Sequence, residues 1–173
     1  MRISTRGEYG LRALMELGIA SESALSLRDI AGRQHISLDY LEQIMPALKA
    51  AGLIKAKRGA TGGYQLAKHP AEITVYDALV ALEGPLDPMM CLSSGVPADA
   101  LPASKTDRDV SCLASGSCAV QEVWREMRDA LENVLKRLTL AELLDRQERR
   151  FGVPIRTYST PPKGSVVPLV VLN

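Results

Sequence analysis

The stretch from residue 26 to residue 67 constrains the fold of this chain more than any other part of the sequence. Ser26-Leu27-Arg28-Asp29 is a capping-box pattern, which predicts the start of a short helix that stops near Gln34-His35. Ser37 predicts the cap of a second helix, and Gly52 predicts its end. Two short strands, at 53–58 and 64–67, flank the glycine-rich loop GATGG. Two helices around a tight turn, followed by such a hairpin, predict a winged helix-turn-helix.

Pro46 lies inside the second of these helices, in conflict with its apolar periodicity. A proline removes one backbone donor and clashes with the carbonyl group one turn earlier. The sequence therefore predicts a kinked or shortened helix at this point, but not the loss of the helix. The apolar face that the periodicity predicts consists of Leu38, Leu41, Ile44, Met45 and Leu48.

Helices dominate the rest of the chain. The periodicity and the capping signals predict helices near residues 5–20, 74–84, 119–138 and 139–150. The helix at 119–138 carries a long apolar stripe spaced by threes and fours. Residues 85–118 lack periodicity and read as a long loop, a kind of segment that is usually functional or disordered. The fold class is thus mainly α with a small β-hairpin.

Charge is distributed unevenly along the chain. Residues 1–68 carry ten Lys and Arg against six Asp and Glu, whereas residues 69–173 carry eleven against fourteen. The N-terminal part is therefore the better candidate to bind a polyanion. We expect a cytoplasmic protein, because no stretch of about 18 apolar residues predicts a membrane span, the start lacks a signal-peptide pattern, and three cysteines do not suit a secreted disulfide framework.

The predicted helix-turn-helix suggests which side chains would meet DNA. The second helix of such a pair enters the major groove with its N-terminal residues at the base edges. Gln can read adenine, and Glu can accept a hydrogen bond from cytosine. Lys55, Lys57 and Arg58 precede the glycines of the hairpin and suit phosphate or minor-groove contact. The positions that would face the bases are Ser37, Asp39, Tyr40, Glu42 and Gln43.

The three cysteines lie at Cys91, Cys112 and Cys118, the last of them directly before a predicted helix. Thiolates are the usual ligands of iron–sulfur clusters, and a helix N-terminus favours a thiolate. A Cys112–Cys118 disulfide switch, a zinc site, inert cysteines and a cluster-free sensor of a small molecule remain open alternatives. An enzyme is not expected, since the chain has no phosphate-binding loop, no Cys-x-x-Cys pair and few histidines.

Four stretches resemble the IscR-type winged-helix iron–sulfur transcription regulators, a family that includes nitric-oxide and redox sensors. They are MRISTRGEYGLRALMELG, ISLDYLEQIMPALKAAGLI, KRGATGGYQLAKHPAEITVYDALVALEG and the cysteine loop, so the resemblance covers roughly residues 1–150. It implies a homodimer joined by the long helix, which binds double-stranded DNA at a palindromic operator and has no membrane partner or small-molecule substrate. The family's DNA-reading positions correspond to Ser37, Asp39, Tyr40, Glu42, Gln43 and Arg58.

The resemblance divides the chain into four segments. Residues 1–84 would form the winged helix-turn-helix DNA-binding domain, and 85–118 the cluster-binding loop. Residues 119–150 would form the dimerisation helices, and 151–173 a C-terminal tail without an assigned role. The expected function is a transcription regulator that senses redox state, nitric oxide or iron–sulfur status. The alternative is a cluster-free thiol-switch or zinc-containing regulator that uses Cys112 and Cys118.

The implied cluster ligands are Cys91, Cys112 and Cys118, but the chain departs from the usual pattern twice. Twenty residues separate the first two cysteines, and Gln121 stands where the family's namesake has a histidine. The resemblance indicates Glu8 of the partner subunit as the fourth ligand, with His35 as runner-up, while His69 is expected to be solvated. A mixed ligand set favours a two-iron cluster over a four-iron one.

Overall fold

The computed structural model describes residues 3–21, 23–59, 62–89, 92 and 119–152. Most of the predicted loop at 85–118 and of the predicted tail at 151–173 lies outside this part. The described residues confirm the mainly α fold with one small antiparallel hairpin. In chain order the elements are α1 (Thr5–Ile19), α2 (Leu27–Gln34), α3 (Leu38–Ala50), β1 (Ile54–Lys57), β2 (Gly63–Leu66), the short 3-10 helix η1 (Pro70–Glu72), α4 (Val75–Glu83), α5 (Ala119–Arg137) and α6 (Leu140–Phe151).

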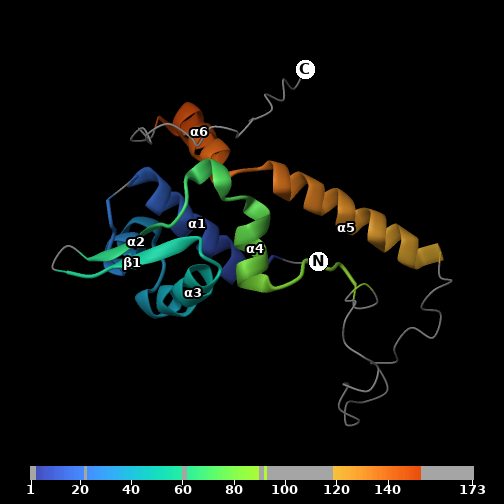
Figure 1. Cartoon of the computed structure of the whole chain (residues 1–173), viewed down its shortest axis with the longest axis horizontal. Helices are drawn as coiled ribbons and strands as arrows, with labels where there is room; N and C mark the ends of the chain where they lie inside the picture. Colours follow the sequence, from blue (N-terminus) through green and yellow to red (C-terminus); the bar gives the residue numbers. More distant parts are fainter. Residues whose placement is uncertain (1–2, 22, 60–61, 90–91, 93–118, 153–173) are drawn as a thin grey trace, which may run out of the picture.

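Helix α1 runs through the middle of the body, and the other helices and the hairpin pack around it (Figure 1). Its buried side chains, among them Leu14 and Leu17 at 0% exposure, form the centre of the core. Gly10 lets α4 approach closely, because a Cβ atom there would lie 2.2 Å from the side chain of Leu82. Gly18 does the same for α6.

Local capping signals placed most helix ends correctly. Ser26 and Asp29 form the predicted capping box, with the Asp29 N–H donating to Ser26 Oγ at 3.1 Å. The hydrogen bond from the Ser26 hydroxyl lowers the pKa of Asp29. Gly52 has φ +68° after the end of α3, and the following Leu53 N–H donates to the Leu48 carbonyl at 3.0 Å. This pairing closes α3 as a Schellman motif.

The helix is present at Pro46, as predicted, and of the predicted kink or shortening the shortening is wrong, since α3 continues without a break from Leu38 to Ala50. The proline is exposed, and so is Glu42, whose carbonyl loses its usual intrahelical partner. Because that carbonyl lies on the solvent side, water can replace the missing N–H, and the helix keeps its length.

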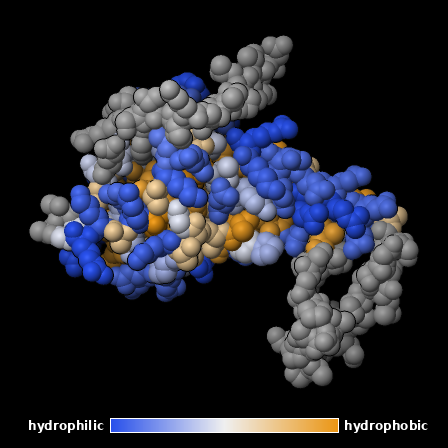
Figure 2. Space-filling model, in the orientation of Figure 1, coloured by the Kyte–Doolittle hydropathy of each residue, from blue (hydrophilic) through white to orange (hydrophobic). Residues whose placement is uncertain are grey.

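The long helix α5 leaves the body as an arm, and among the described elements it is the C-terminal half of α5 that packs against α4 (Figure 1). Leu135 is buried against α4 in a small cluster with Val75 and Leu79. Toward the N-terminal end the apolar stripe lies open to solvent, while the face of the arm seen in Figure 2 is mostly hydrophilic, with hydrophobic residues at its lower edge. Val120, Val123, Met127 and Val134 are 45–56% exposed.

Helix α6 folds back from the arm onto α1. The Val75 N–H donates to the Leu138 carbonyl at 2.8 Å, and the Leu140 N–H donates to the Ile73 carbonyl at 2.8 Å. These bonds fix the α5–α6 junction beside the start of α4. Leu140 and Leu144, each 2% exposed, complete the same core that the winged-helix segment uses.

Candidate nucleic-acid interface

A short turn joins α2 to α3 and sets the direction of α3. His35 ends α2 in the left-handed conformation (φ 54°, ψ 43°), which histidine tolerates better than most residues do. Ile36, 5% exposed, anchors the turn in the core, and its N–H donates to the Ala31 carbonyl at 3.1 Å. Ser37 then accepts the N–H of Tyr40 at 3.3 Å and caps α3. The turn is therefore held at both ends.

The N-terminal half of α3 presents polar side chains to solvent. One face of the helix is the predicted apolar face, where Leu41 and Ile44 are at most 1% exposed. The opposite face is open, and four of the predicted base-reading residues are exposed on it: Ser37, Asp39, Glu42 and Gln43. The fifth, Tyr40, is half-buried, and its ring packs edge-on against Tyr9 of α1 at 5.6 Å. Tyr40 thus helps to hold α3 on the body.

The wing is a two-stranded hairpin fastened to the chain before α2. Ile54 pairs with Leu66, and Lys57 pairs with Gly63. The Leu25 and Tyr64 backbones exchange two hydrogen bonds, of 2.9 and 2.8 Å. Arg58 follows β1 directly and is exposed, while residues 60–61 at the tip lie outside the described part. The hairpin that precedes Arg58 extends from the body beside α2 (Figure 1), so the wing adjoins the helix-turn-helix.

A polar network ties α1 to the end of α2. Arg12 donates from Nε to Gln34 Oε1 at 2.8 Å and from Nη2 to the Gln34 carbonyl at 2.6 Å. The Gln34 amide in turn donates to the buried carboxylate of Glu16 at 2.5 Å, and Arg33 donates to the same carboxylate at 3.3 Å. Arg12 also pairs with Glu8 at 3.5 Å. The network fixes the position from which the turn to α3 begins.

Replacing Arg12 with alanine is expected to lower the free energy of unfolding by about 1–3 kcal/mol, because Gln34 loses two donors in a half-buried place. Urea denaturation measures the change. Arg28→Ala on the exposed face of α2 is the matched control, with an expected change within about 0.5 kcal/mol. Equal stability of the two variants would show that the network does not hold α2.

The predicted cofactor ligands are only partly placed. Cys91, Cys112 and Cys118 lie outside the described residues. The Glu8 side chain is 63% exposed, and its ion pair with Arg12 is long, at 3.5 Å. A carboxylate in this setting fits a ligand role, because it can turn toward a metal without leaving a core. Within the described part of the chain, no three His, Cys, Asp or Glu side chains are grouped to hold a metal ion.

The two histidines differ in their surroundings. His35 is exposed at the turn before α3. His69, expected to be solvated, is instead half-buried, and its Nδ1 accepts the N–H of Ala71 at 3.2 Å. The expectation was wrong because the ring caps η1, a 3-10 helix that the sequence pattern did not predict. Glu72 completes this cap by accepting the His69 N–H at 3.1 Å.

Glu83, the last residue of α4, clamps the start of α1 and was missed from the sequence. Its Oε1 accepts the Ser4 hydroxyl at 2.6 Å and the Gly7 N–H at 2.9 Å. A carboxylate at a helix N-terminus is stabilised by the free N–H groups there. These hydrogen bonds join the first turn of α1, which contains Glu8, to the end of α4, just before the segment 85–118 begins. Gly7 and Gly10, three residues apart in α1, were the available sign of this close contact.

A tight helix-turn-helix, an open polar face on its second helix and an adjacent basic wing define a winged-helix DNA-binding transcription regulator. The chain belongs to the Rrf2 family, which is described as an iron-dependent transcriptional regulator and which matches residues 3–146. This assignment confirms the resemblance drawn from the sequence. The similar proteins described next are transcription regulators, and this chain is a regulator of the same kind and not an enzyme.

Three relatives illustrate the similarity. The HTH-type transcriptional regulator IscR of Cronobacter sakazakii (strain ATCC BAA-894) is 33% identical over 149 residues, 86% of this chain and 83% of that protein. The structure of T. potens IscR is 34% identical with a TM-score of 0.66, covering 87% of this chain and 91% of its own. The structure of CymR (YrzC), the global cysteine regulator of B. subtilis, is 35% identical with a TM-score of 0.64, covering 84% and 98%.

Across the described residues, none of the helices combines the length and the apolar character needed to cross a membrane.

Proposed function

We propose that the protein is a homodimeric transcription regulator that binds a palindromic operator and senses redox state, nitric oxide or iron–sulfur status through a bound iron–sulfur cluster. The observation that carries the DNA part is the open N-terminal half of α3 beside the basic wing, in a chain of the Rrf2 family. We place it in the cytoplasm, where a bacterial chromosome lies, and without a membrane partner or small-molecule substrate.

In this proposal the exposed side chains of α3 read bases, and the wing contacts the backbone or the minor groove. Gln43 suits adenine and Glu42 suits cytosine, since these pairings match donors and acceptors in the major groove. Ser37 and Asp39 lie at the start of the helix, where further base edges come within reach. Arg58 at the wing suits a phosphate or a narrow minor groove. Tyr40 forms a T-shaped ring pair with Tyr9 of α1 and mainly orients the reading helix.

Two variants separate base reading from backbone contact on an operator fragment that the wild-type protein has selected from random DNA. Gln43→Ala is expected to weaken operator binding about 5- to 100-fold without changing its salt dependence. Arg58→Ala is expected to weaken binding to all sequences and to reduce the salt slope by about one. Fluorescence anisotropy at several salt concentrations measures both.

The matched control is Arg150→Ala, which removes the same charge at the exposed end of α6. It is expected to leave affinity and salt slope unchanged. An unchanged slope for Arg58→Ala would remove the wing contact, and unchanged affinity for Gln43→Ala would remove that residue from the reading face.

The proposed dimer contact is the open stripe of α5. Val120, Val123 and Met127 are 45–56% exposed and follow one side of a helix that has left the body. An apolar stripe spaced by threes and fours pairs well with a second copy of itself. Trp124 is half-buried on the same helix and adds a large side chain that suits the centre of an interface.

Val123→Asp is expected to raise the dimer dissociation constant at least about 100-fold, because the new carboxylate would be buried without a partner. Light scattering at micromolar protein concentration measures the mass. Asn133→Asp places a new carboxylate on the polar side of α5 and is expected to leave the dimer intact. A monomer in the wild-type protein, or a dimer in Val123→Asp, would contradict the proposed contact.

Cys91, Cys112, Cys118 and Glu8 are the proposed cluster ligands, with His35 as the alternative to Glu8. A bound cluster would supply one-electron redox chemistry and reactivity toward nitric oxide, and a mixed thiolate and carboxylate set favours two irons. Arg12 contacts both Glu8 and the last carbonyl of α2. If Glu8 bound a cluster, its ion pair with Arg12 would change, and this would alter the hydrogen bonds from Arg12 to Gln34 just before the turn to α3.

A second candidate function is a cluster-free thiol switch or a zinc-containing regulator built on Cys112 and Cys118. The likeness to CymR supports it, since the Staphylococcus aureus CymR, 34% identical to this chain, has a solved oxidized form. The two candidates differ in colour: a cluster absorbs visible light, and thiols or zinc do not. DNA binding with and without dithiothreitol would then test the switch.

A further inference from the structure

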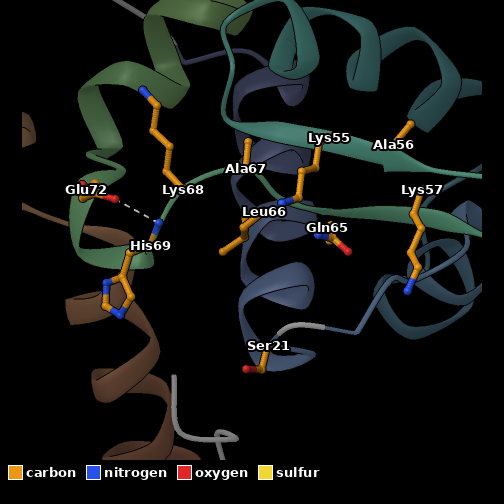
Figure 3. A pocket seen from close by; sticks show the side chains of 10 residues that line it. All are labelled: Ser21, Lys55, Ala56, Lys57, Gln65, Leu66, Ala67, Lys68, His69 and Glu72. Carbon is orange, nitrogen blue, oxygen red and sulfur yellow. Dashed lines mark hydrogen bonds between the residues drawn. The ribbon is translucent and has the colours of Figure 1, made fainter. Parts of the chain in front are cut away.

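A hollow on the outer face of the wing takes no part in the proposed contacts of α3. It has a volume of about 760 Å³ and lies between the hairpin, the residues that follow β2, η1 and the end of α1 (Figure 3). Sites for small ligands typically measure about 300–1,000 Å³. The hollow is thus large enough for a ligand of several heavy atoms.

The strand register places two lysines on the same side of this hollow. Ile54 is 2% exposed and faces the core, and successive side chains in a strand point to opposite faces. Lys55 and Lys57 therefore leave β1 together on the outer face, as Figure 3 shows. Gln65 pairs with Lys55 and adds an amide to the same face.

Lys68 and Ser21 extend the polar lining beyond the hairpin. In Figure 3, Lys68 flanks the hollow with its ammonium group turned away from the other two. Its four-carbon stem has free rotation, so the ammonium can reach a bound anion. The Ser21 hydroxyl lies on the opposite side, at the end of α1.

Few carboxylates lie near these lysines among the described residues of the lining. Among the described residues that line the hollow, Glu72 is the one carboxylate, and it already accepts the His69 N–H at 3.1 Å. The ion pairs of the described residues involve Lys136 and several arginines, but not Lys55, Lys57 or Lys68. Three lysines thus line one hollow, and Glu72 is the single carboxylate among its described lining residues.

We propose that this hollow is a binding site for a phosphate-class oxyanion. Ammonium groups bind phosphate oxygens as point charges, and the Gln65 amide and the Ser21 hydroxyl can donate further hydrogen bonds. The described lining contains no Phe, Tyr or Trp ring, and its one imidazole, that of His69, caps η1. The phosphate belongs either to the DNA backbone beside the operator or to a free phosphorylated compound. If a DNA phosphate fills the site, it deepens the proposed wing contact and rests on the proposed function, and if a free compound fills it, the site goes beyond that function.

The test is a titration of the DNA-free full chain with inorganic phosphate at constant ionic strength, followed by NMR of ¹³C-labelled lysine side chains. The signals of Lys55, Lys57 and Lys68 are expected to shift and saturate, and that of Lys49, exposed on α3, is not. Lys55→Gln is expected to weaken phosphate binding about tenfold, whereas Lys49→Gln leaves it unchanged. Chloride in place of phosphate gives the background.

Salt-dependent operator binding then distinguishes the two sources. A DNA phosphate predicts that Lys55→Gln lowers the salt slope by about one and that phosphate competes with the operator. If the ligand is a free phosphorylated compound, Lys55→Gln is expected to leave the salt slope unchanged, and phosphate is expected to bind to the complex of the protein with DNA. Equal shifts of Lys49 and Lys55, or no saturation, overturn the site, and so does tighter binding of an acidic peptide than of phosphate. The NMR titration contains no DNA, so it tests the phosphate site even if the protein binds no operator and the proposed function fails.

Discussion

Replacing Gly63 with alanine is expected to lower the free energy of unfolding by about 3 kcal/mol and to weaken operator binding at least tenfold. A Cβ atom at this position would lie 2.2 Å from the carbonyl oxygen of Leu25 and 2.9 Å from the nitrogen of Ser26. These are backbone atoms, so no side-chain rotation relieves the contact. The strand must move away, and the paired hydrogen bonds between Leu25 and Tyr64 would then break.

The effect on DNA binding follows from where the wing is fastened. Leu25 directly precedes the cap of α2, so a displaced hairpin disturbs both the wing and the helix-turn-helix. Gly32→Ala is the matched control, because no atom lies within 4 Å of a Cβ there and the residue is inside α2. It is expected to stabilise the protein by about 0.5–1 kcal/mol. Urea denaturation and anisotropy measure both variants, and equal stability of the two would contradict the close contact.

Replacing Cys118 with alanine is expected to abolish visible cluster absorption and iron binding and to change operator affinity. The described part of helix α5 begins at Ala119, directly after this cysteine in the chain, and thiolates are the usual ligands of iron–sulfur clusters. The fold is expected to survive, because the described core does not depend on this residue. Far-ultraviolet circular dichroism checks the fold, and anaerobic spectra with iron and sulfide analysis check the cluster.

The wild-type protein sets the reference for this experiment. Iron and acid-labile sulfide near two each per chain would support the two-iron cluster. Glu8→Ala is then expected to retain colour with an altered spectrum, since three thiolates remain. Retained absorption in Cys118→Ala would remove this residue from the ligand set. A wild-type protein that stays colourless and iron-free after reconstitution would leave the thiol switch as the better candidate.

Much of the local structure could be predicted because it depends on residues close together in the chain. The Ser26–Asp29 and Thr74–Asp77 capping boxes form over three residues, and the Gly52 end of α3 needs only its own turn. The order of helices and hairpin then identified the winged helix. Five of the six DNA-reading candidates, all except Tyr40, are exposed where the pattern suggested.

Contacts between distant residues could not be predicted in this way. The Glu83 clamp joins residues 76 and 79 positions apart, and Arg12 reaches Gln34 over 22 positions. Neither pairing leaves a periodic signal, because each side chain alone resembles an ordinary surface group. The same holds for Tyr40 against Tyr9, a candidate base contact whose ring also serves packing.

The sequence by itself determined the class of protein: the helix ends, the winged helix and the family follow from short-range capping rules and motifs. Only the tertiary structure decided how the apolar stripe of α5 is used, with Leu135 buried on α4 and Val123 left open. The tertiary structure also shows that α6 completes the core. It places Lys55, Lys57 and Lys68 around the hollow on the outer face of the wing. The physical reason is that the burial of a side chain and the charges around it depend on which elements pack together. The spacing of residues along the chain does not specify that packing.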